Sequence, residues 1–216
     1  MTEPKYKPIP FTAPMVRAIL EGRKTQTRRI VKPGTWNPTS EEYSGEVKLI
    51  VAPGVVGLQA YFKHIELDTW HGVKCPYGQP GDRLWVKETY CYHDDLARCL
   101  YKADGINSLK WNPSIHMPRW ASRITLEITG VRVERLQDIS EDEVFAEGIE
   151  KLSDPCDVKT ERAMKKCLGK NEWDDFGPYW TDPIFAYRCL WNSIHGPGSW
   201  DKNPWVWVIE FKRVDG

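Results

Sequence analysis

Lys24 and Thr27 are the residues of this chain whose types and spacing best suit catalysis, because only two residues separate them. A single helical turn or tight loop at this spacing brings the lysine amine beside the threonine hydroxyl. The hydroxyl becomes a nucleophile when a base takes its proton, and a lysine is such a base when burial or nearby cations lower its pKa. Arg23 and Arg28 are candidate cations. The pair is thus a candidate for nucleophilic catalysis, although the Lys-x-x-Thr pattern is common by itself.

The pair lies in a strongly basic stretch. The segment from Met15 to Lys32 contains one acid, Glu21, and the following basic residues: Arg17, Arg23, Lys24, Arg28, Arg29 and Lys32. In a chain with a formal net charge of zero, this local excess predicts a phosphate-binding surface. The same pattern also suits a solvated helix end, where cations are favoured by the helix dipole. Charge alone leaves both interpretations open.

A second group of residues has the types that bind metals. His64, His71, Cys75, Cys91 and His93 cluster in the sequence, and His64-Ile65-Glu66 matches half of the zinc deaminase signature. Its P-C-x-x-C partner is missing, and the spacing fits no ordinary structural zinc site. The sequence also lacks a phosphate-binding loop, a dinucleotide fingerprint, a nucleophile elbow and an H-E-x-x-H motif. We expect neither a metal nor an organic cofactor.

Composition narrows the class of protein. The 216 residues are 41% hydrophobic and 28% charged, with a mean hydropathy of -0.54, which is typical of a soluble globular protein. The sequence has no apolar run of about 18 residues and its N-terminus lacks the apolar core of a signal peptide, so we expect a cytoplasmic protein without membrane contact. Its 6 cysteines contain no C-x-x-C pair and are expected to be free thiols.

Tryptophan is unusually frequent, with 11 residues. Four of them fall on expected helices or strands and are predicted to be core residues: Trp85, Trp191, Trp205 and Trp207. The others fall in loop-like regions: Trp36, Trp70, Trp111, Trp120, Trp173, Trp180 and Trp200. Packing is the first interpretation for each of these, and stacking on an unpaired base is the alternative.

The elements that must position Lys24 and Thr27 can be predicted from the pattern around them. Residues 11–22 indicate a short helix that Thr12 caps, with Pro14 in its first turn and Gly22 just after its end. The basic stretch that follows predicts a loop running into a short strand. Lys24 and Thr27 are therefore expected at the exit of a helix.

The remaining pattern mixes strands with short helices. Residues 84–90 indicate a strand after a turn at 78–82, and residues 122–136 indicate two half-buried strands or one long bulged strand. Ser140 and Glu143 form a capping box for a helix that ends at Gly148. The other expected elements are one or two strands within 33–80, a helix over 182–195 and a central strand over 205–214. The order predicts an α+β fold around a small, mostly antiparallel sheet or barrel.

The motifs together resemble a known family. The stretch LEGRKTQTRR at 20–29 is similar to the L-x-G-x-K-T-x-T-x-R signature of the ASCH domain. The segments GDRLWV at 81–86, 128–136, 140–148 and VIEF at 208–211 resemble its later elements in the same order. The chain is also similar to ASCH proteins encoded by phages and prophages. The resemblance implies a PUA-like, mostly antiparallel β-barrel with flanking short helices, as one domain over residues 1–216 with insertions near 33–80, 91–120 and 150–182.

The resemblance also implies an activity. One branch of the family is an amidohydrolase that removes the acetyl group of N4-acetylcytidine with a Lys, a Thr and a Glu, which fall on Lys24, Thr27 and Glu147 here. Glu143 or Glu150 takes the place of Glu147 if the alignment shifts. Other members are ribonucleases or bind RNA, so the resemblance specifies the fold better than the reaction.

Three hypotheses follow. In the first, Lys24 deprotonates Thr27, Thr27 attacks an acylated cytosine nucleoside, and Glu147 protonates the leaving nitrogen or positions the substrate, while Arg23 or Arg28 stabilises the oxyanion. In the second, the chain binds RNA or a modified base without catalysis, through the cations Arg17, Arg23, Arg28 and Arg29 and the loop tryptophans. The third is a ribonuclease, for which the sequence offers no evident histidine pair because His116 and His195 each suit a structural role.

Overall fold

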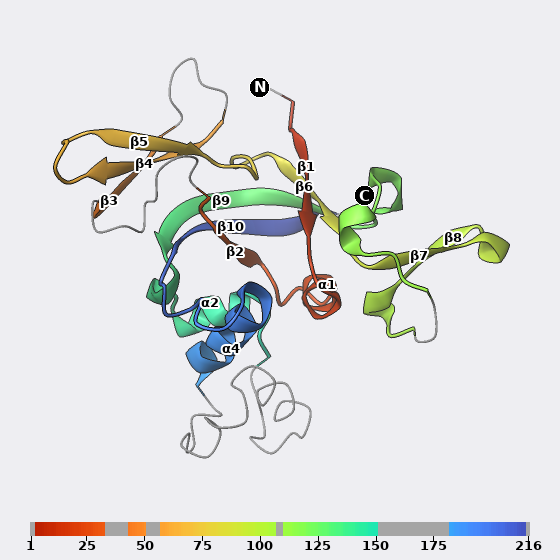
Figure 1. Cartoon of the computed structure of the whole chain (residues 1–216). Coiled ribbons are helices and arrows are strands. Elements are labelled where there is room, and N and C mark those ends of the chain that lie inside the picture. The colour runs from red at the N-terminus through yellow and green to blue at the C-terminus, as the bar shows by residue number, and fades with distance from the viewer. Residues whose placement is uncertain (1–2, 33–42, 51–56, 107–109, 151–181, 215–216) are drawn as a thin grey trace.

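The computed structural model describes residues 3–32, 43–50, 57–106, 110–150 and 182–214. Its main feature is a five-stranded sheet in the order β1-β6-β9-β10-β2 (Figure 1). These strands are β1 Tyr6–Pro10, β6 Arg83–Lys87, β9 Thr125–Arg135, β10 Trp205–Val214 and β2 Gln26–Ile30. β1 pairs with β6 in parallel, and the other neighbours are antiparallel.

The α+β class is confirmed, with mostly strands and a few short helices. The described strands form open sheets, and no pairing among them joins the edge strands β1 and β2 into a closed barrel. Pro8 and Pro10 lie on the edge strand β1, where the missing N–H groups cost no ladder hydrogen bond.

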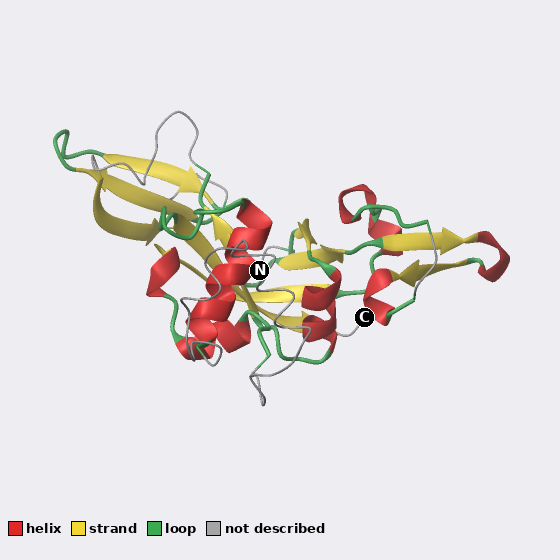
Figure 2. Ribbon diagram, turned by 60° about the horizontal axis from the view of Figure 1, so that its bottom comes forward, coloured by secondary structure: helices red, strands yellow, loops and turns green. Residues whose placement is uncertain are grey.

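The other strands form two smaller sheets. β3 Tyr43–Ile50, β4 Gln59–His64 and β5 Trp70–Lys74 form an antiparallel sheet, so the first insertion holds three strands where the sequence indicates one or two. β7 Tyr90–His93 and β8 Arg98–Tyr101 form a hairpin. Both project from the main sheet in different directions (Figure 2). Most of the expected insertion near 150–182 lies outside the described residues.

Three α-helices flank the main sheet: α1 Ala13–Leu20, α2 Glu141–Ala146 and α4 Pro183–His195. The helix ends follow the sequence signals, with one exception. Gly22 has a φ of +77° just past α1, the Ser140–Glu143 capping box begins α2, and Asp182 accepts a hydrogen bond from the Ile184 N–H at 2.8 Å at the start of α4. Thr12 is the N-cap residue of α1, as expected, but its side chain forms no capping hydrogen bond.

β9 is one long strand with a register shift against β10 at Glu210/Phe211, which selects the bulged-strand alternative. β10 has strands on both sides, as expected for a central strand. Trp207 and Ile209 on β10 pack into a core with β6 and β4, whereas Val206 and Val208 face a second core with α2 and α4. Burial on both faces explains why the first half of this strand, Trp205–Ile209, is continuously apolar.

The structure confirms some of the tryptophan predictions and contradicts others. Trp191, Trp205 and Trp207 are buried, which confirms them as core residues, and Trp200 in a loop-like region is buried too. Trp85 is only half-buried because it points to the face of β6 opposite the core, so its assignment to the core is wrong. Trp120 is exposed, with 69% of its surface accessible. Trp36, Trp173 and Trp180 lie outside the described residues.

Candidate functional site

Lys24 lies in the turn between α1 and β2, where tight packing holds the backbone. Its N–H donates to the carbonyl of Ala18 at 3.0 Å, and the N–H of Thr25 donates to the carbonyl of Ala146, at the end of α2, at 2.9 Å. Gly148 follows α2 with a φ of +93°, and an added Cβ there would lie 2.9 Å from the Cβ of Ala18 and 3.0 Å from that of Lys24. The close approach and the positive φ require glycine, which brings Glu147 against Lys24.

Lys24 and Glu147 form a buried ion pair. The Lys24 Nζ donates to Glu147 Oε2 at 2.7 Å and to the Glu147 carbonyl oxygen at 2.8 Å, and their side chains are 0% and 4% exposed. Burial lowers the pKa of Lys24 from its ordinary value, while the negative charge of Glu147 opposes this shift. The other candidate glutamates pair elsewhere, since Glu143 contacts Arg28 and Glu150 contacts Arg23. A lysine poised in this way is chemically suited to exchange a proton.

Arg28 joins Glu147 to a larger network of charges. Its guanidinium lies 3.3 Å from Glu147 Oε1 and 3.1 Å from Glu143 Oε2, and its Nε donates to Glu134 Oε1 at 3.0 Å. Arg132 in turn contacts Glu134 and Glu143. Because three carboxylates surround the buried Arg28, this side chain positions Glu147 rather than presenting a free charge to a phosphate.

Tyr187 on α4 completes the surroundings of Glu147. Burial raises the pKa of Tyr187 well above its usual range and the negative charge of Glu147 raises it further, so the hydroxyl stays protonated. The sequence indicated only that Tyr187 lies on the apolar side of a helix. The one signal in the sequence was a polar aromatic residue on the apolar side of this helix. Such a residue can be either a core residue or a hydrogen-bond donor.

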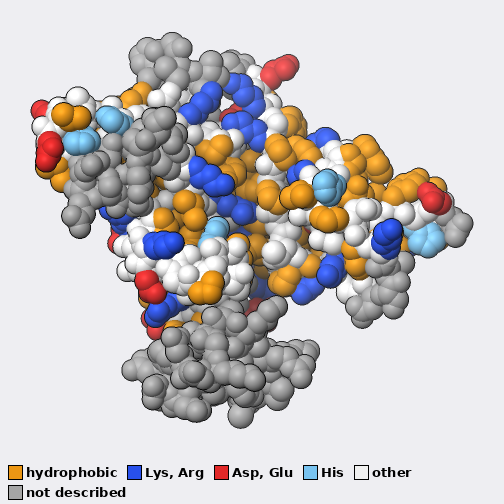
Figure 3. All heavy atoms as spheres, in the orientation of Figure 1, with side chains coloured by type: hydrophobic (Ala, Val, Ile, Leu, Met, Phe, Trp, Pro, Cys, Tyr) orange, Lys and Arg blue, Asp and Glu red, His pale blue; other side chains and the backbone are white. Residues whose placement is uncertain are grey.

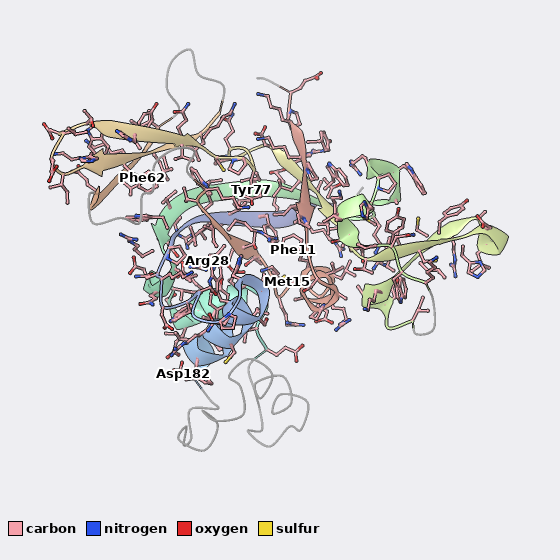
Figure 4. The ribbon with its side chains drawn as sticks, viewed as in Figure 1. Phe11, Met15, Arg28, Phe62, Tyr77 and Asp182 are labelled. Atoms are coloured by element: carbon pink, nitrogen blue, oxygen red, sulfur yellow. The ribbon has the colours of Figure 1, made fainter. Side chains whose placement is uncertain are left out.

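A pocket opens beside this network, between the free edge of β2, α1 and α4. It contains about 330 Å³ of empty space, part of which is open to solvent. Its lining is Met15, Thr27, Arg28, Arg29, Glu147, Tyr187, Leu190, Trp191, Ile194 and His195. Figure 3 shows basic and hydrophobic side chains gathered over β2 and α4, and Figure 4 shows Arg28 and Met15 in this part of the molecule.

Thr27 and Glu147 therefore face one cavity, while Lys24 lies behind Glu147 and is not part of the lining. Within the described residues, the Thr27 hydroxyl forms no hydrogen bond, and Lys24 donates to Glu147 rather than to Thr27. Of the three predicted residues, Thr27 and Glu147 thus line the same pocket, and Lys24 contacts Glu147 outside that lining.

The four arginines predicted to bind phosphate are dispersed. Arg17 points away from the pocket lining and donates to the carbonyl of Ala103, and Arg23 is held by Glu21, Glu150 and the carbonyl of Gly148. Arg28 is buried among acids. Arg29 lines the pocket and lies over the Phe11 ring at 5.2 Å.

Two polar atoms of the pocket residues lack partners in the described part of the chain. They are the buried Nε of Arg29 and the buried indole Nε1 of Trp191. A buried N–H donor without an acceptor costs about 1–3 kcal/mol, so each is a potential contact for an acceptor on a bound molecule. His195, which the sequence suggested to be structural, also lines the pocket and stacks on Trp191 with ring centroids 4.2 Å apart.

Among the described residues, no group of three or more His, Cys, Asp or Glu side chains is arranged to hold a metal ion. Cys75, Cys91, Cys99 and Cys189 are free thiols, while Cys156 and Cys167 lie outside the described ranges. No described helix is both long and apolar enough to cross a membrane. No family model, curated protein or solved structure matches this chain.

Proposed function

We propose that the chain is an ASCH-type amidohydrolase that removes an acyl group from N4-acylated cytosine nucleosides, with N4-acetylcytidine giving cytidine and acetate. The observation that carries this proposal is the buried Lys24–Glu147 pair beside a pocket that Glu147 and Thr27 both line. A base with a lowered pKa, a carboxylate and a free hydroxyl are the groups that acyl transfer through a nucleophile needs.

In the proposed reaction, Lys24 first passes a proton to the Glu147 carboxylate, and its neutral Nζ then exchanges its hydrogen bond with the Glu147 carbonyl for one with Thr27 and takes the hydroxyl proton. The Thr27 oxygen attacks the acyl carbonyl, and a C–O bond forms. When the C–N bond breaks, the proton passes from Lys24 to the leaving exocyclic nitrogen through the Glu147 carboxylate. Water then attacks the acyl-threonine, with Lys24 and Glu147 transferring protons as before, and the carboxylic acid is released.

The developing oxyanion is proposed to lie against Arg28. Thr25 accepts a hydrogen bond from the N–H of Phe211, and the N–H of Val31 donates to the carbonyl of Trp205, so the backbone N–H groups of the even residues in β2 point to its free edge. The Arg28 N–H therefore faces away from β10, next to Thr27. This N–H supplies a donor that is fixed before the reaction, whereas the guanidinium is occupied by carboxylates. Arg23, the other candidate, does not line the pocket and is paired with acids.

The substrate class follows from the lining. Met15, Leu190 and Ile194 are apolar, and Trp191 and His195 offer flat rings to a nucleobase. The unpaired N–H donors of Arg29 and Trp191 suit the acceptor atoms of a pyrimidine. The scheme needs no metal or organic cofactor, and a modified nucleoside or RNA as substrate is consistent with a cytoplasmic protein.

The finer description of the fold belongs to the same proposal. The open sheet, with its bulged β9 and interior β10, is interpreted as a PUA-like arrangement in which the strands continue toward a barrel. The insertions near 33–80, 91–120 and 150–182 enlarge one domain that spans residues 1–216. The order of the short helices and strands supports this interpretation.

A non-catalytic module that binds a modified base is the second candidate, and one observation favours it. The unpaired donors of Arg29 and Trp191 serve binding without any reaction. A ribonuclease gains less support, because the pocket contains a single histidine, His195, and His116 lies outside its lining.

The test is a chromatographic assay of N4-acetylcytidine, its deoxy form and a short acetylated RNA. The variants are Thr27→Ala and Lys24→Met, with Thr25→Ala as the matched control because Thr25 is exposed and does not line the pocket. Release of cytidine by the wild type and by Thr25→Ala, but not by the other two variants, supports the amidohydrolase. Intact substrate with retained binding of the acetylated base favours the binding module.

A further inference from the structure

A second surface lies at the other edge of the main sheet from the pocket. β1 and β6 are at one edge and β2 is at the opposite edge, and α2 and α4 pack over the β10–β2 side (Figure 1). On the face of the sheet opposite the core that contains Trp207 and Ile209, the β1 and β6 side chains are accessible. Tyr6 is 48% exposed, and Arg83, Trp85 and Lys87 are half-buried.

The register places these side chains in two adjacent rows. Tyr6 lies beside Arg83, Pro8 beside Trp85, and Pro10 beside Lys87. Partners in a sheet share a face, and their Cβ atoms lie close together. Aromatic and cationic residues therefore alternate over a small area. We call this area, with Arg119 at its rim, the β1–β6 face.

Cations and rings contact one another across this face. The Arg83 guanidinium lies 5.7 Å from the Tyr6 ring centroid, and the Lys87 ammonium lies 5.6 Å from that of Trp85. Arg119 lies 5.7 Å from Tyr6 and 5.9 Å from Trp85, so it bridges the two rings. These contacts hold the rings and charges in place before any partner arrives.

The three cations have no carboxylate partner among the described residues. Arg83 donates to the Tyr6 hydroxyl at 2.8 Å, and Lys87 donates to the carbonyl of Ile115. Glu127, on the neighbouring strand of the same face, is paired with Lys212 at 2.9 Å. In a chain whose charges balance overall, this is a local excess of positive charge combined with accessible aromatic rings.

We infer that the β1–β6 face binds a single-stranded nucleic acid, with bases stacked on Tyr6 and Trp85 and phosphates on Arg83, Lys87 and Arg119. Single strands offer unstacked bases together with phosphates, and aromatic rings interleaved with cations recognise both. An acidic peptide matches the charge but gains nothing from flat rings. The site is independent of the proposed amidohydrolase, because none of these residues lines the pocket.

The test measures binding of a fluorescently labelled 12-nucleotide strand by anisotropy, with unmodified RNA and DNA arms, so that no acyl group is present. Three phosphate contacts predict a slope of about −2 in log K against log salt, or roughly 15- to 20-fold weaker binding at 200 mM than at 50 mM salt. Trp85→Leu is expected to weaken binding roughly 5- to 150-fold, the loss typical of one stacked base. Arg119→Gln is expected to lower the salt slope by about 0.7.

Lys48→Gln is the matched control, because it removes one positive charge from another cation–ring contact, 4.2 Å from Trp70, on the smaller sheet. Circular dichroism checks the fold of each variant, and Arg119→Gln at an exposed position keeps the test valid if Trp85→Leu unfolds. Salt-sensitive binding of either strand that weakens in Arg119→Gln, and in Trp85→Leu where that variant folds, but not in Lys48→Gln or Thr27→Ala, supports the inference. No binding at 50 mM salt, binding insensitive to Arg119→Gln, loss in Thr27→Ala, or equal competition by poly-glutamate overturns it.

Discussion

We expect the loss of Glu147 to lower the free energy of unfolding more than the loss of Lys24, its partner in the buried ion pair. In Lys24→Met, the Glu147 carboxylate keeps its hydrogen bond from the Arg28 guanidinium at 3.3 Å. In Glu147→Gln, Lys24 remains buried without a carboxylate partner, because Glu147 supplies its ion pair in the described part of the chain. Removal of one partner of a buried pair costs about 3–5 kcal/mol when a bare charge is left behind. We therefore expect that loss for Glu147→Gln.

For Lys24→Met, we expect a smaller loss of about 1–2 kcal/mol, since the remaining carboxylate stays hydrogen-bonded. The double variant should be more stable than Glu147→Gln alone, because it contains no unpaired lysine. Urea unfolding at pH 7 measures all three free energies of unfolding. Equal losses for the single variants, or a double variant less stable than Glu147→Gln, would refute the reasoning.

The free energy of unfolding of Glu147→Gln should change with pH in a defined direction. Burial lowers the pKa of Lys24, and the carboxylate that opposes this shift is absent in Glu147→Gln. Between the lowered pKa of the folded state and about 10.5, the unfolded chain therefore binds more protons than the folded one. The free energy of unfolding should rise with pH in that window, over a wider range in Glu147→Gln than in the wild type. A flat profile of the variant up to pH 10 would contradict this.

Three further predictions concern neighbouring residues. Gly148→Ala should lose more stability than Gly22→Ala in urea unfolding, because both have a positive φ but an added Cβ meets Ala18 and Lys24 only at Gly148; equal losses would contradict the tight contact. Above pH 10 the wild type should lose stability as unfolded Tyr187 ionises while folded Tyr187 stays protonated, and Tyr187→Phe should reduce that loss in unfolding measured from pH 9 to 11. Trp191→Phe should raise the KM for the acylated nucleoside several-fold, whereas Trp207→Phe, which removes another unpaired indole N–H outside the pocket, should leave it unchanged; equal effects would deny Trp191 a role in binding.

Local signals in the sequence predicted the elements that carry the site. The capping box at Ser140, the Asp182-Pro183 start of α4 and the glycine after α1 each specify a helix end through neighbouring residues. Apolar and polar residues alternate in β9, and the first half of β10 is apolar on both faces. These local patterns indicated how each strand is buried. These features depend on contacts within a few residues, which the sequence displays directly.

Features that depend on distant contacts were not predictable in the same way. The roles of Tyr187 and His195 arise because α4 packs beside β2, which lies far away in the sequence. Trp85 was assigned to the core because its strand is apolar, whereas the register of β1 and β6 turns it to the accessible face. Whether Glu143, Glu147 or Glu150 pairs with Lys24 was open until the turn at Gly148 was seen.

The central claim, that Thr27 is the nucleophile of an amidohydrolase, is tested most directly by a search for its acylated form. Protein mixed with N4-acetylcytidine is quenched rapidly in acid, digested and analysed by mass spectrometry. The account predicts one acetyl group on Thr27 in the wild type, none in Thr27→Ala, and release of cytidine only where that species forms. Release of cytidine by Thr27→Ala at the wild-type rate, without acetylated peptide in either protein, would contradict it.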